Sequence, residues 1–301
     1  MNSIHPGARL KALIVAAKAS GQPVVAPGCY DGLTARLVER AGFNVAYMSG
    51  LCVASTLGEP DVGAITADAM VERARVVAGC TGIPLIVDAD SGYGGAYNVA
   101  QAVRAFETAG AAALHLEDQP FPKKCAAMAG KTLIAVPEMV ARLRVALDAR
   151  RNQDFMIIAR TDAFAVEGLD AAIARVQAYE AAGADATIIM SVASEEDMRR
   201  ITANLRKPSI VMMVEGLRPL VPATRLGEIG YPLVVYPVSL LQAQAHAQQR
   251  MLETLQRDGS TAACADASLT LNDINETVGL ERARDADAAY DRYINEAHAA
   301  S

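Results

Sequence analysis

The chain has 301 residues, a hydrophobic fraction of 52% and a formal net charge of −6. This length suits one large α/β domain or two small ones, and the apolar content supplies a sizeable core and argues against disorder. With 34 acidic against 28 basic residues, the chain has no basic footprint for a nucleic acid, so we expect no nucleic-acid partner.

The sequence holds five widely spaced cysteines: Cys29, Cys52, Cys80, Cys125 and Cys264. They form no metal-ligand pair and no disulfide framework, and reduced thiols in a cytoplasmic protein are the simplest explanation. The apolar patch at residues 12–17 lies between Lys11 and Lys18. It is too short for a transmembrane span and lacks the layout of a signal peptide, so we expect a surface helix there and no membrane partner.

Eight short apolar runs predict buried strands at residues 24–26, 45–48, 85–87, 113–116, 156–159, 187–190, 210–213 and 233–236. Helical patterns follow these runs at residues 32–41, 67–78, 97–108, 137–150, 169–182, 195–205, 223–229 and 240–256. Several of the helices end at Ala-Gly before the next strand, which is typical of glycine C-caps. Such alternation indicates a parallel sheet, and eight repeats match the (β/α)8 or TIM barrel of the α/β class.

A doubly wound open sheet is the alternative fold. It would be expected to carry a Gly-x-Gly-x-x-Gly turn after its first strand, and residues 27–32 do not form one. Past residue 258 the chain is first alanine-rich and then charged, with one or two amphipathic helices predicted over residues 271–299. We expect a barrel catalytic domain over residues 1–257 and a C-terminal helical tail over residues 258–301, which either caps its own barrel or packs on a neighbouring subunit.

The third predicted strand ends in two carboxylates, Asp88 and Asp90, followed by a glycine-bearing turn. Strand residues two apart point to the same side, so the two side chains are expected to project together. Like charges at one place repel unless a cation or a shared proton compensates them. For this pair taken alone, a polar strand-to-helix turn is the alternative interpretation.

Several other predicted strands also end in polar residues, and the chemistry of a barrel lies at the carboxyl ends of its strands. These ends carry Tyr47, Ser49, Gly50, Glu117, Asp118, Gln119, Arg160, Asp162, Glu215 and Ser239. Carboxylates gathered at one mouth repel one another, and an oxygen-ligated hard cation, Mg²⁺ first, explains the cluster. A histidine–cysteine set for zinc is missing, and His115, inside the fourth strand, is interpreted as a core residue or one that supports the site.

Arg160 is a natural partner for a substrate carboxylate, because its planar fork matches that group in two hydrogen bonds. A structural ion pair with Asp162 or Glu117 is the alternative. The small residues Ser49 and Gly50 allow close approach, so their backbone N–H groups can hold a carboxylate or an oxyanion.

The loop after the fourth strand carries Lys123, Lys124 and Cys125. Adjacent lysines attract anions and favour the thiolate form of a neighbouring cysteine. A cysteine in such a loop can serve as a general acid that closes over the site. A basic surface loop with an incidental cysteine is the alternative.

Taken together, residues 47–50, 88–94, 115–119, 123–125 and 159–162 resemble the isocitrate lyase / phosphoenolpyruvate mutase superfamily, and the resemblance runs from about residue 6 to residue 256. It is closest to the methylisocitrate lyase and 2,3-dimethylmalate lyase type. The resemblance implies a barrel whose last helix is exchanged between the subunits of a homotetramer. It also implies Mg²⁺, or Mn²⁺ in its place, held by Asp88, Asp90 and Glu117, and a metal-stabilised 2-oxo acid enolate.

The same resemblance implies roles for individual residues. Cys125 is the acid that protonates the departing carbanion, Tyr47 is a base or a relay, and Arg160 holds the acid substrate as part of the catalytic set. The implied substrate-binding residues are Ser49, Gly50, Leu51, Asp61, Lys123, Arg160 and Glu215.

Two departures from the lyase pattern narrow the substrate. Ala126 and Ala127 stand where the lyases have glycine and histidine, and residues 212–215 read Met-Met-Val-Glu where the lyases tend to have Asn-x-Thr-Glu. Both changes point away from a tricarboxylate such as isocitrate. We expect a carbon–carbon lyase that cleaves a 2-hydroxy dicarboxylate, of the substituted malate or methylisocitrate type, to a 2-oxo acid such as pyruvate and a second carboxylate.

Two kinds of alternative stay open. One is a related enzyme: an oxaloacetate decarboxylase or acetylhydrolase, or a mutase of the phosphoenolpyruvate or carboxyphosphonoenolpyruvate type. The other is a catalytically degenerate barrel that binds an acid metabolite as a sensor or scaffold.

Overall fold

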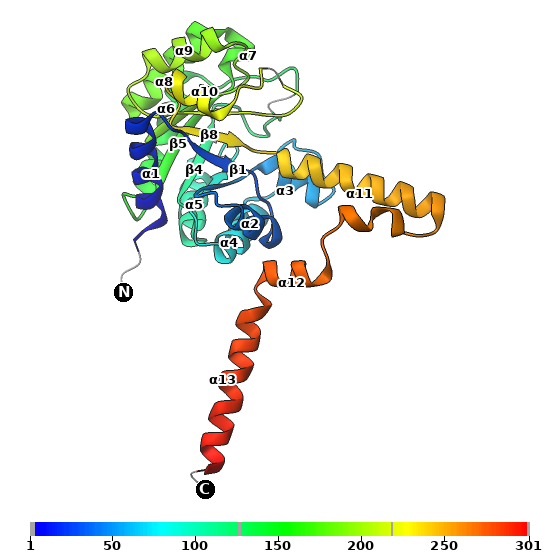
Figure 1. Cartoon of the computed structure of the whole chain (residues 1–301). Coiled ribbons are helices and arrows are strands. Elements are labelled where there is room, and N and C mark those ends of the chain that lie inside the picture. The colour runs from blue at the N-terminus through cyan, green and yellow to red at the C-terminus, as the bar shows by residue number, and fades with distance from the viewer. Residues whose placement is uncertain (1–3, 126–127, 218, 300–301) are drawn as a thin grey trace. The chain divides into compact units, whose positions relative to one another are not determined.

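The computed structural model describes residues 4–125, 128–217 and 219–299. Its sheet has eight strands: β1 (Val24–Pro27), β2 (Ala46–Met48), β3 (Leu85–Asp88), β4 (Ala113–Glu117), β5 (Met156–Thr161), β6 (Ala186–Ile189), β7 (Ser209–Met212) and β8 (Leu233–Tyr236). All neighbouring strands pair in parallel, in the order β1-β8-β7-β6-β5-β4-β3-β2. A single bridge between Gly28 and Tyr47 joins β1 to β2, so the sheet forms a nearly closed barrel (Figure 1).

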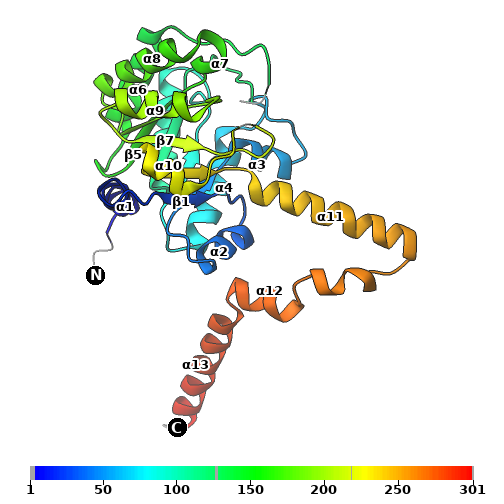
Figure 2. The same ribbon diagram turned by 45° about the horizontal axis from the view of Figure 1, so that its top comes forward.

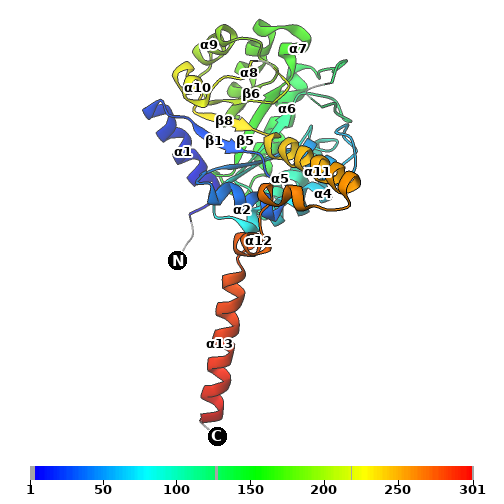
Figure 3. The same cartoon turned by 45° about the vertical axis from the view of Figure 1, so that its right-hand side comes forward.

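Helices alternate with the strands and cover the outside of the sheet, as the turned views show (Figures 2 and 3). Up to residue 258 they are α1 (Pro6–Ser20), α2 (Gly32–Arg40), α3 (Gly50–Thr56), α4 (Ala67–Cys80), α5 (Ala96–Thr108), α6 (Val136–Ala149), α7 (Ala163–Glu167), α8 (Leu169–Ala182), α9 (Glu195–Asn204), α10 (Ala223–Ile229) and α11 (Ser239–Asp258). Each expected strand and helix is present with bounds shifted by one or two residues. The (β/α)8 barrel is confirmed, and the doubly wound alternative is wrong.

The strands read as continuous apolar runs because both of their faces are buried. On β3, Ile86 points into the barrel interior, whereas Leu85 and Val87 pack in the layer between the sheet and the helices. On β4, Leu114 and Leu116 take the outer layer in the same way. The alternation by two also sends every second residue at the end of a strand into the mouth of the barrel.

Local signals set the ends of the helices. The Asp31 carboxylate accepts a hydrogen bond from the Thr34 N–H at 2.7 Å, and the two residues form a capping box at the start of α2. At the other end of the helices, Gly42, Gly110 and Gly183 have φ values of 86°, 94° and 113°. These left-handed positions strain any side chain, which explains the Ala-Gly pairs noted in the sequence.

The structure contains two short helices that the sequence did not predict. They are α3, directly after β2, and α7, directly after β5. Their N-cap residues, Ser49 and Asp162, are types that favour a helix start, although neither makes a side-chain hydrogen bond there. With seven and five residues, the two helices are too short to show a helical period in the sequence. Both follow strands whose ends form the mouth of the barrel.

The residues from Ala243 onward form a second compact unit. After the end of α11 this unit contains a short 3-10 helix (Ala262–Ala267), α12 (Leu271–Val278) and α13 (Leu280–Ala299). The expected pair of C-terminal helices is therefore present, with Gly279 between them in a left-handed conformation. Among the described residues, no helix combines the length and the apolar character that crossing a membrane requires.

Candidate active site

A cavity of about 330 Å³ opens at the carboxyl ends of the strands. Its polar lining consists of Tyr47, Ser49, Asp88, Cys125, Arg160, Glu215 and Gln242. Its apolar lining includes Leu51, Met190, Met212, Val214, Leu217 and Val238. Seven of the expected site residues therefore line one cavity, and they come from the ends of β2, β3 and β5, the start of α3 and the loops after β4 and β7. They are Tyr47, Ser49, Leu51, Asp88, Cys125, Arg160 and Glu215.

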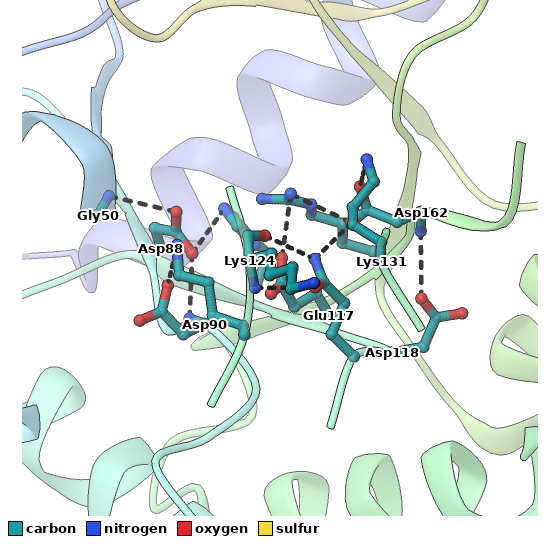
Figure 4. A network of polar contacts seen from close by, with 12 residues as sticks. Gly50, Asp88, Asp90, Glu117, Asp118, Lys124, Lys131 and Asp162 are labelled. Carbon is teal, nitrogen blue, oxygen red and sulfur yellow. Dashed lines mark hydrogen bonds and ion pairs between the residues drawn. The ribbon is translucent and has the colours of Figure 1, made fainter. Parts of the chain in front are cut away.

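Asp88 and Asp90 lie side by side in the buried turn after β3, as expected from their spacing (Figure 4). Asp88 accepts hydrogen bonds from the Gly50 N–H at 3.2 Å and from the Asp90 N–H at 3.0 Å. Gly50 therefore already donates to a protein carboxylate. A Cβ at Gly50 would lie 3.2 Å from Asp90 Oδ1, so this position favours glycine.

The turn itself holds unusual backbone conformations. Asp90 has a φ of 47° and Tyr93 a φ of 61°, values that side chains other than glycine rarely adopt. Such strain persists where the surrounding structure fixes it, and it is common at functional sites. Here it aims the Asp90 carboxylate back toward the strand ends.

The electrostatic environment shifts the pKa values of Asp88 and Asp90 in opposite directions. Burial and the charge of Asp88 raise the pKa of Asp90 to about 6. For Asp88 burial acts in the same direction, but the neighbouring side chains of His115, Lys123 and Arg160 outweigh it and hold the pKa of Asp88 below its usual value. The site therefore favours one firmly ionised carboxylate beside one that exchanges a proton more readily.

Lys123 is the nearest cation to this pair. Its ammonium group lies 2.5 Å from Asp61 Oδ1 and 3.0 Å from Asp90 Oδ1, and the side chain is buried. Burial lowers the pKa of Lys123, but Asp90 and the carboxylates around it outweigh this effect and raise it above its ordinary value. Lys123 and Asp61 do not line the cavity; they act on it through Asp90.

Arg160 connects the carboxylates of β4 and β5. Its NH2 group lies 3.0 Å from Glu117 Oε2 and 3.2 Å from Asp162 Oδ2. The ion pairs considered as an alternative for Arg160 are thus both present. The same side chain lines the cavity, and its buried Nε has no hydrogen-bond partner among the described residues, so it retains a donor for a ligand.

Tyr47 and His115 form a buried pair beneath the cavity. The Tyr47 hydroxyl lies 2.7 Å from His115 Nε2, and the two rings are stacked with centroids 5.8 Å apart. Burial lowers the pKa of His115 to about 4 and raises the pKa of Tyr47 well above its ordinary value. Neutral forms of both side chains are therefore favoured, and His115 is a buried residue that supports the site, as interpreted from the sequence.

Cys125 lies in the loop after β4 and is 9% exposed. Its backbone N–H donates to the Asp61 carbonyl oxygen at 3.2 Å, which ties the cysteine to the loop after β2. The substituted positions Ala126 and Ala127 lie outside the described residues. Across the cavity, the Ser239 hydroxyl donates to the Glu215 carboxylate.

Asp118 faces away from the cavity, although it follows Glu117 directly. Its carboxylate accepts hydrogen bonds from the hydroxyl groups of Thr161 at 2.6 Å and Tyr179 at 2.8 Å and from the Asp162 N–H at 3.1 Å. This residue was not among the expected site residues, but it joins the ends of β4 and β5 to α8. Successive side chains of a strand point to opposite faces of the sheet, so Asp118 is expected to point away from the mouth when Glu117 points into it.

The acidic side chains at the barrel mouth are candidate ligands for a metal ion. No group of three or more His, Cys, Asp or Glu side chains within residues 4–125, 128–217 and 219–299 is arranged to hold an ion directly. However, Glu117 Oε1 is buried without a hydrogen-bond partner in the same part of the chain, and the nearby donors are all oxygens. Because Mg²⁺ keeps several waters and takes only one or two carboxylates, Asp88 and Asp90 fit direct ligation, with Glu117 acting through water.

The chain was compared with known proteins. The family model for phosphoenolpyruvate phosphomutase matches residues 14–256. A 2,3-dimethylmalate lyase from Eubacterium barkeri is 42% identical over 269 residues, which cover 89% of this chain and 93% of that protein. A 2-methylisocitrate lyase from Aeropyrum pernix is 36% identical, with 91% and 88% covered.

Solved structures agree with these relatives. An oxaloacetate acetylhydrolase in complex with the inhibitor 3,3-difluorooxalacetate superimposes with a TM-score of 0.89 at 31% identity, covering 95% of this chain and 97% of that one. A 2,3-dimethylmalate lyase, a member of the PEP mutase/isocitrate lyase superfamily, gives 0.88 at 33% identity, with 95% and 96% covered. A phosphonopyruvate hydrolase complex with oxalate and Mg²⁺ gives 0.85 at 30% identity, with 95% and 99% covered.

A parallel eight-stranded barrel with carboxylates and an arginine at its mouth defines an enzyme that handles a small organic acid. The chain belongs to the phosphoenolpyruvate phosphomutase family, within the superfamily that its motifs resemble. It is a carbon–carbon lyase of this superfamily, as expected from the sequence. The degenerate barrel without activity is therefore set aside.

We expect Asp118→Asn to destabilise the protein, because the amide places an N–H₂ group against the donors of Thr161 and Tyr179. A buried charged acceptor lost in this way costs about 2–4 kcal/mol. Urea unfolding measures the change. The matched control is Asp170→Asn, which breaks an exposed pair with Arg200 and is expected to change stability by about 0.5 kcal/mol or less. Equal effects of the two substitutions would contradict this account of Asp118.

Proposed function

We propose that the protein is a Mg²⁺-dependent lyase for a 2-hydroxy dicarboxylate that carries an apolar substituent, of the substituted malate or methylisocitrate type. The products are a 2-oxo acid, such as pyruvate, and a second carboxylate. The observation that carries the proposal is the mixed lining of the cavity: Asp88 and Arg160 supply a charged part, and Met212 and Val214, from β7 and the residues just after it, supply an apolar wall. The charged part suits the carboxyl and hydroxyl groups of an acid, and the apolar wall suits methyl groups.

In this proposal Arg160 binds the carboxylate next to the hydroxyl carbon. Its Nε supports the assignment, because this donor is buried and has no hydrogen-bond partner among the described residues. A guanidinium matches a carboxylate with two parallel hydrogen bonds. Ser49 and Leu51 line the same cavity and orient the bound acid, while Glu215 and its partner Ser239 limit the cavity on the far side.

Asp88, Asp90 and Glu117 are proposed to hold Mg²⁺, or Mn²⁺ in its place, with Asp61 and Lys123 adjusting the charge around Asp90. When bound, the ion would supply Lewis-acid stabilisation of the negative charge that develops on the substrate's C2 oxygen as its hydroxyl proton leaves. The all-oxygen donor set and the buried, unpartnered Glu117 Oε1 within the described residues support this assignment.

Bond cleavage requires a proton to leave the substrate hydroxyl and a proton to reach the departing carbon. The C2–C3 electron pair stays with C3, and Cys125 is proposed to protonate that carbon, because the cysteine lines the cavity beside the apolar wall. Tyr47 is proposed as a relay for the hydroxyl proton. Its hydrogen bond with His115 supports a relay over a permanent phenolate, since burial raises the pKa of the phenol.

One observation favours a second candidate function. The superposition with oxaloacetate acetylhydrolase is as close as that with the dimethylmalate lyase, so cleavage of oxaloacetate is the rival activity. The apolar wall favours the substituted malate, because oxaloacetate offers no methyl group to fill it. Mutase activity toward a phosphonate has no matching feature in the cavity, whose only arginine or lysine is Arg160 among the described lining residues.

The proposal predicts which acids the enzyme cleaves. With Mg²⁺, 2,3-dimethylmalate and citramalate are expected to release a 2-oxo acid fastest, because they place methyl groups on the apolar wall and carry only two carboxylates. 2-Methylisocitrate is expected to react more slowly because of its third carboxylate, and isocitrate, oxaloacetate and phosphonopyruvate, which lack the methyl group, are expected to react slowest. Coupled detection of the 2-oxo acid measures the rates. Chelation of divalent ions with EDTA is expected to abolish the release, and added Mg²⁺ or Mn²⁺ to restore it.

A cysteine variant separates the lyase from its rivals. Cys125→Ser is expected to lower kcat for the substituted malate at least a hundredfold, because a hydroxyl is a far weaker acid than a thiol. Cys264→Ser, in the second compact unit, is the control and should retain full activity. If Cys125→Ser keeps its activity, the acid role is wrong, and preferred turnover of oxaloacetate would support the hydrolase or decarboxylase.

The apolar wall leads to a specificity prediction. Val214→Thr keeps the shape of the side chain but adds a hydroxyl, which opposes a methyl group in the cavity. We expect kcat/KM for the preferred methyl-bearing substrate to fall about tenfold, the scale of one misplaced methyl-sized group. Val166→Thr makes the same change at a side chain that is 45% exposed and should leave kcat/KM unchanged. An unchanged value for Val214→Thr would remove the wall from the specificity argument.

We further propose a cytoplasmic homotetramer in which the helical tail, residues 258–301, packs on a neighbouring subunit by exchange of helices. Leu271, Tyr290 and Tyr293 are 81%, 66% and 67% exposed, and large apolar side chains of this kind usually find a partner. Light scattering after gel filtration should give four times the mass of one chain. The double substitution Tyr290→Ser and Tyr293→Ser is expected to shift the protein to smaller species, and a monomeric unsubstituted protein would contradict the proposal.

A further inference from the structure

The loop between β4 and α6 is attached to the barrel mouth by two buried lysines. Lys123 contacts Asp61 and Asp90, and Lys131 places its Nζ 2.8 Å from Asp162 Oδ1, as Figure 4 shows. Cys125 lies between the two lysines in the sequence. The two lysines contact different parts of the site. Lys123 contacts Asp90, which pairs with Asp88, whereas Lys131 contacts Asp162, which is the partner of Arg160.

Asp162 divides its two oxygens between separate cations. Oδ1 faces Lys131, whereas Oδ2 lies 3.2 Å from the Arg160 NH2 group and accepts from Gln119 Nε2 at 3.4 Å. The carboxylate is completely buried, and its backbone N–H is held by Asp118. Asp162 therefore cannot turn toward solvent, and its charge must be compensated by these neighbours.

Arg160 is balanced between two acids, Glu117 at 3.0 Å and Asp162 at 3.2 Å. Attraction between charges at such distances is strong in a buried site. Without Lys131, the whole charge of Asp162 would act on Arg160. The guanidinium would then be held toward Asp162 and would have less of its hydrogen-bonding capacity for a ligand.

We propose that Lys131 is a positioning residue, which neutralises Asp162 so that Arg160 remains directed to the carboxylate of the bound acid. Lys131 belongs to the same loop as Cys125. The inference deepens the proposed function, since the ligand is the same 2-hydroxy or 2-oxo acid. Lys131 itself does not line the cavity, so its action passes through Asp162 and Arg160.

The same loop contains a matched control. Lys124 is exposed, and its Nζ donates to the Gly130 carbonyl oxygen at 2.8 Å; within the described part of the chain it forms no ion pair with Asp162. Lys124→Met removes one positive charge from the same loop without altering Asp162. Comparison of the two lysines therefore separates the loss of a loop charge from the loss of the Asp162 contact.

The test measures binding of oxalate, a dicarboxylate without the apolar substituent, by calorimetry in the presence of Mg²⁺. Lys131→Met is expected to weaken oxalate binding at least tenfold, while the affinity for Mg²⁺ alone does not fall, because Asp88, Asp90 and Glu117 all keep their charge. Lys124→Met should bind oxalate as the unsubstituted protein does. Lys131→Arg is expected to restore most of the affinity, and Lys131→Gln to give an intermediate value.

Several outcomes would overturn the inference. They are unchanged oxalate affinity in Lys131→Met, an equal loss in Lys124→Met, or affinities that do not fall in the order Arg, Gln, Met, in which first the charge and then the hydrogen-bond donor to Asp162 is lost. A loss of Mg²⁺ affinity together with oxalate affinity would indicate general loosening and would also overturn it. If the unsubstituted enzyme cleaves no 2-hydroxy dicarboxylate but Lys131→Met still weakens oxalate binding, the proposed reaction fails and the positioning role stands.

Discussion

The structure of the barrel mouth depends on the compensation of buried negative charge. Five carboxylates, from Asp61, Asp88, Asp90, Glu117 and Asp162, are paired with three side-chain cations, from Lys123, Lys131 and Arg160. The remaining excess equals the charge of one divalent ion. When protons supply the difference, burial raises the pKa values of Asp90 and Glu117. The carboxylates that are proposed to hold the metal ion are therefore also the ones that take up protons, so the two would compete for them.

This constraint also explains how distant segments are held together. The loops after β2 and β4 meet because Lys123 compensates Asp61 and Asp90, and the loop after β4 reaches β5 because Lys131 compensates Asp162. Breaking one partner of a buried pair is more costly than replacing the whole pair, since it leaves an uncompensated charge. The ion pairs therefore act as positional restraints on the loop that carries Cys125.

The fold could be predicted almost completely, because apolar runs and glycine caps are local signals. The acids at the strand ends could also be predicted, since a barrel gathers the ends of its strands. The contacts of Lys131 and Asp118 could not, because they join residues 31 and 61 positions apart in the sequence. The short helices α3 and α7 were missed because seven and five residues are too few to show a helical period in the sequence.

The polar lining of the cavity concerns the reaction, whereas the apolar lining concerns the choice of substrate. Asp88, Asp90 and Arg160 are proposed to serve the step in which a 2-oxo acid is formed, and that step is compatible with a lyase, a hydrolase or a decarboxylase. Met212 and Val214 come from β7 and the residues just after it, where the sequence departs from the lyase pattern, and they line the cavity. A polar side chain there would bind a third carboxylate, whereas methionine and valine leave such a group without a partner and penalise its burial. The choice of substrate therefore depends on the apolar wall of the cavity, and the reaction depends on the acids themselves.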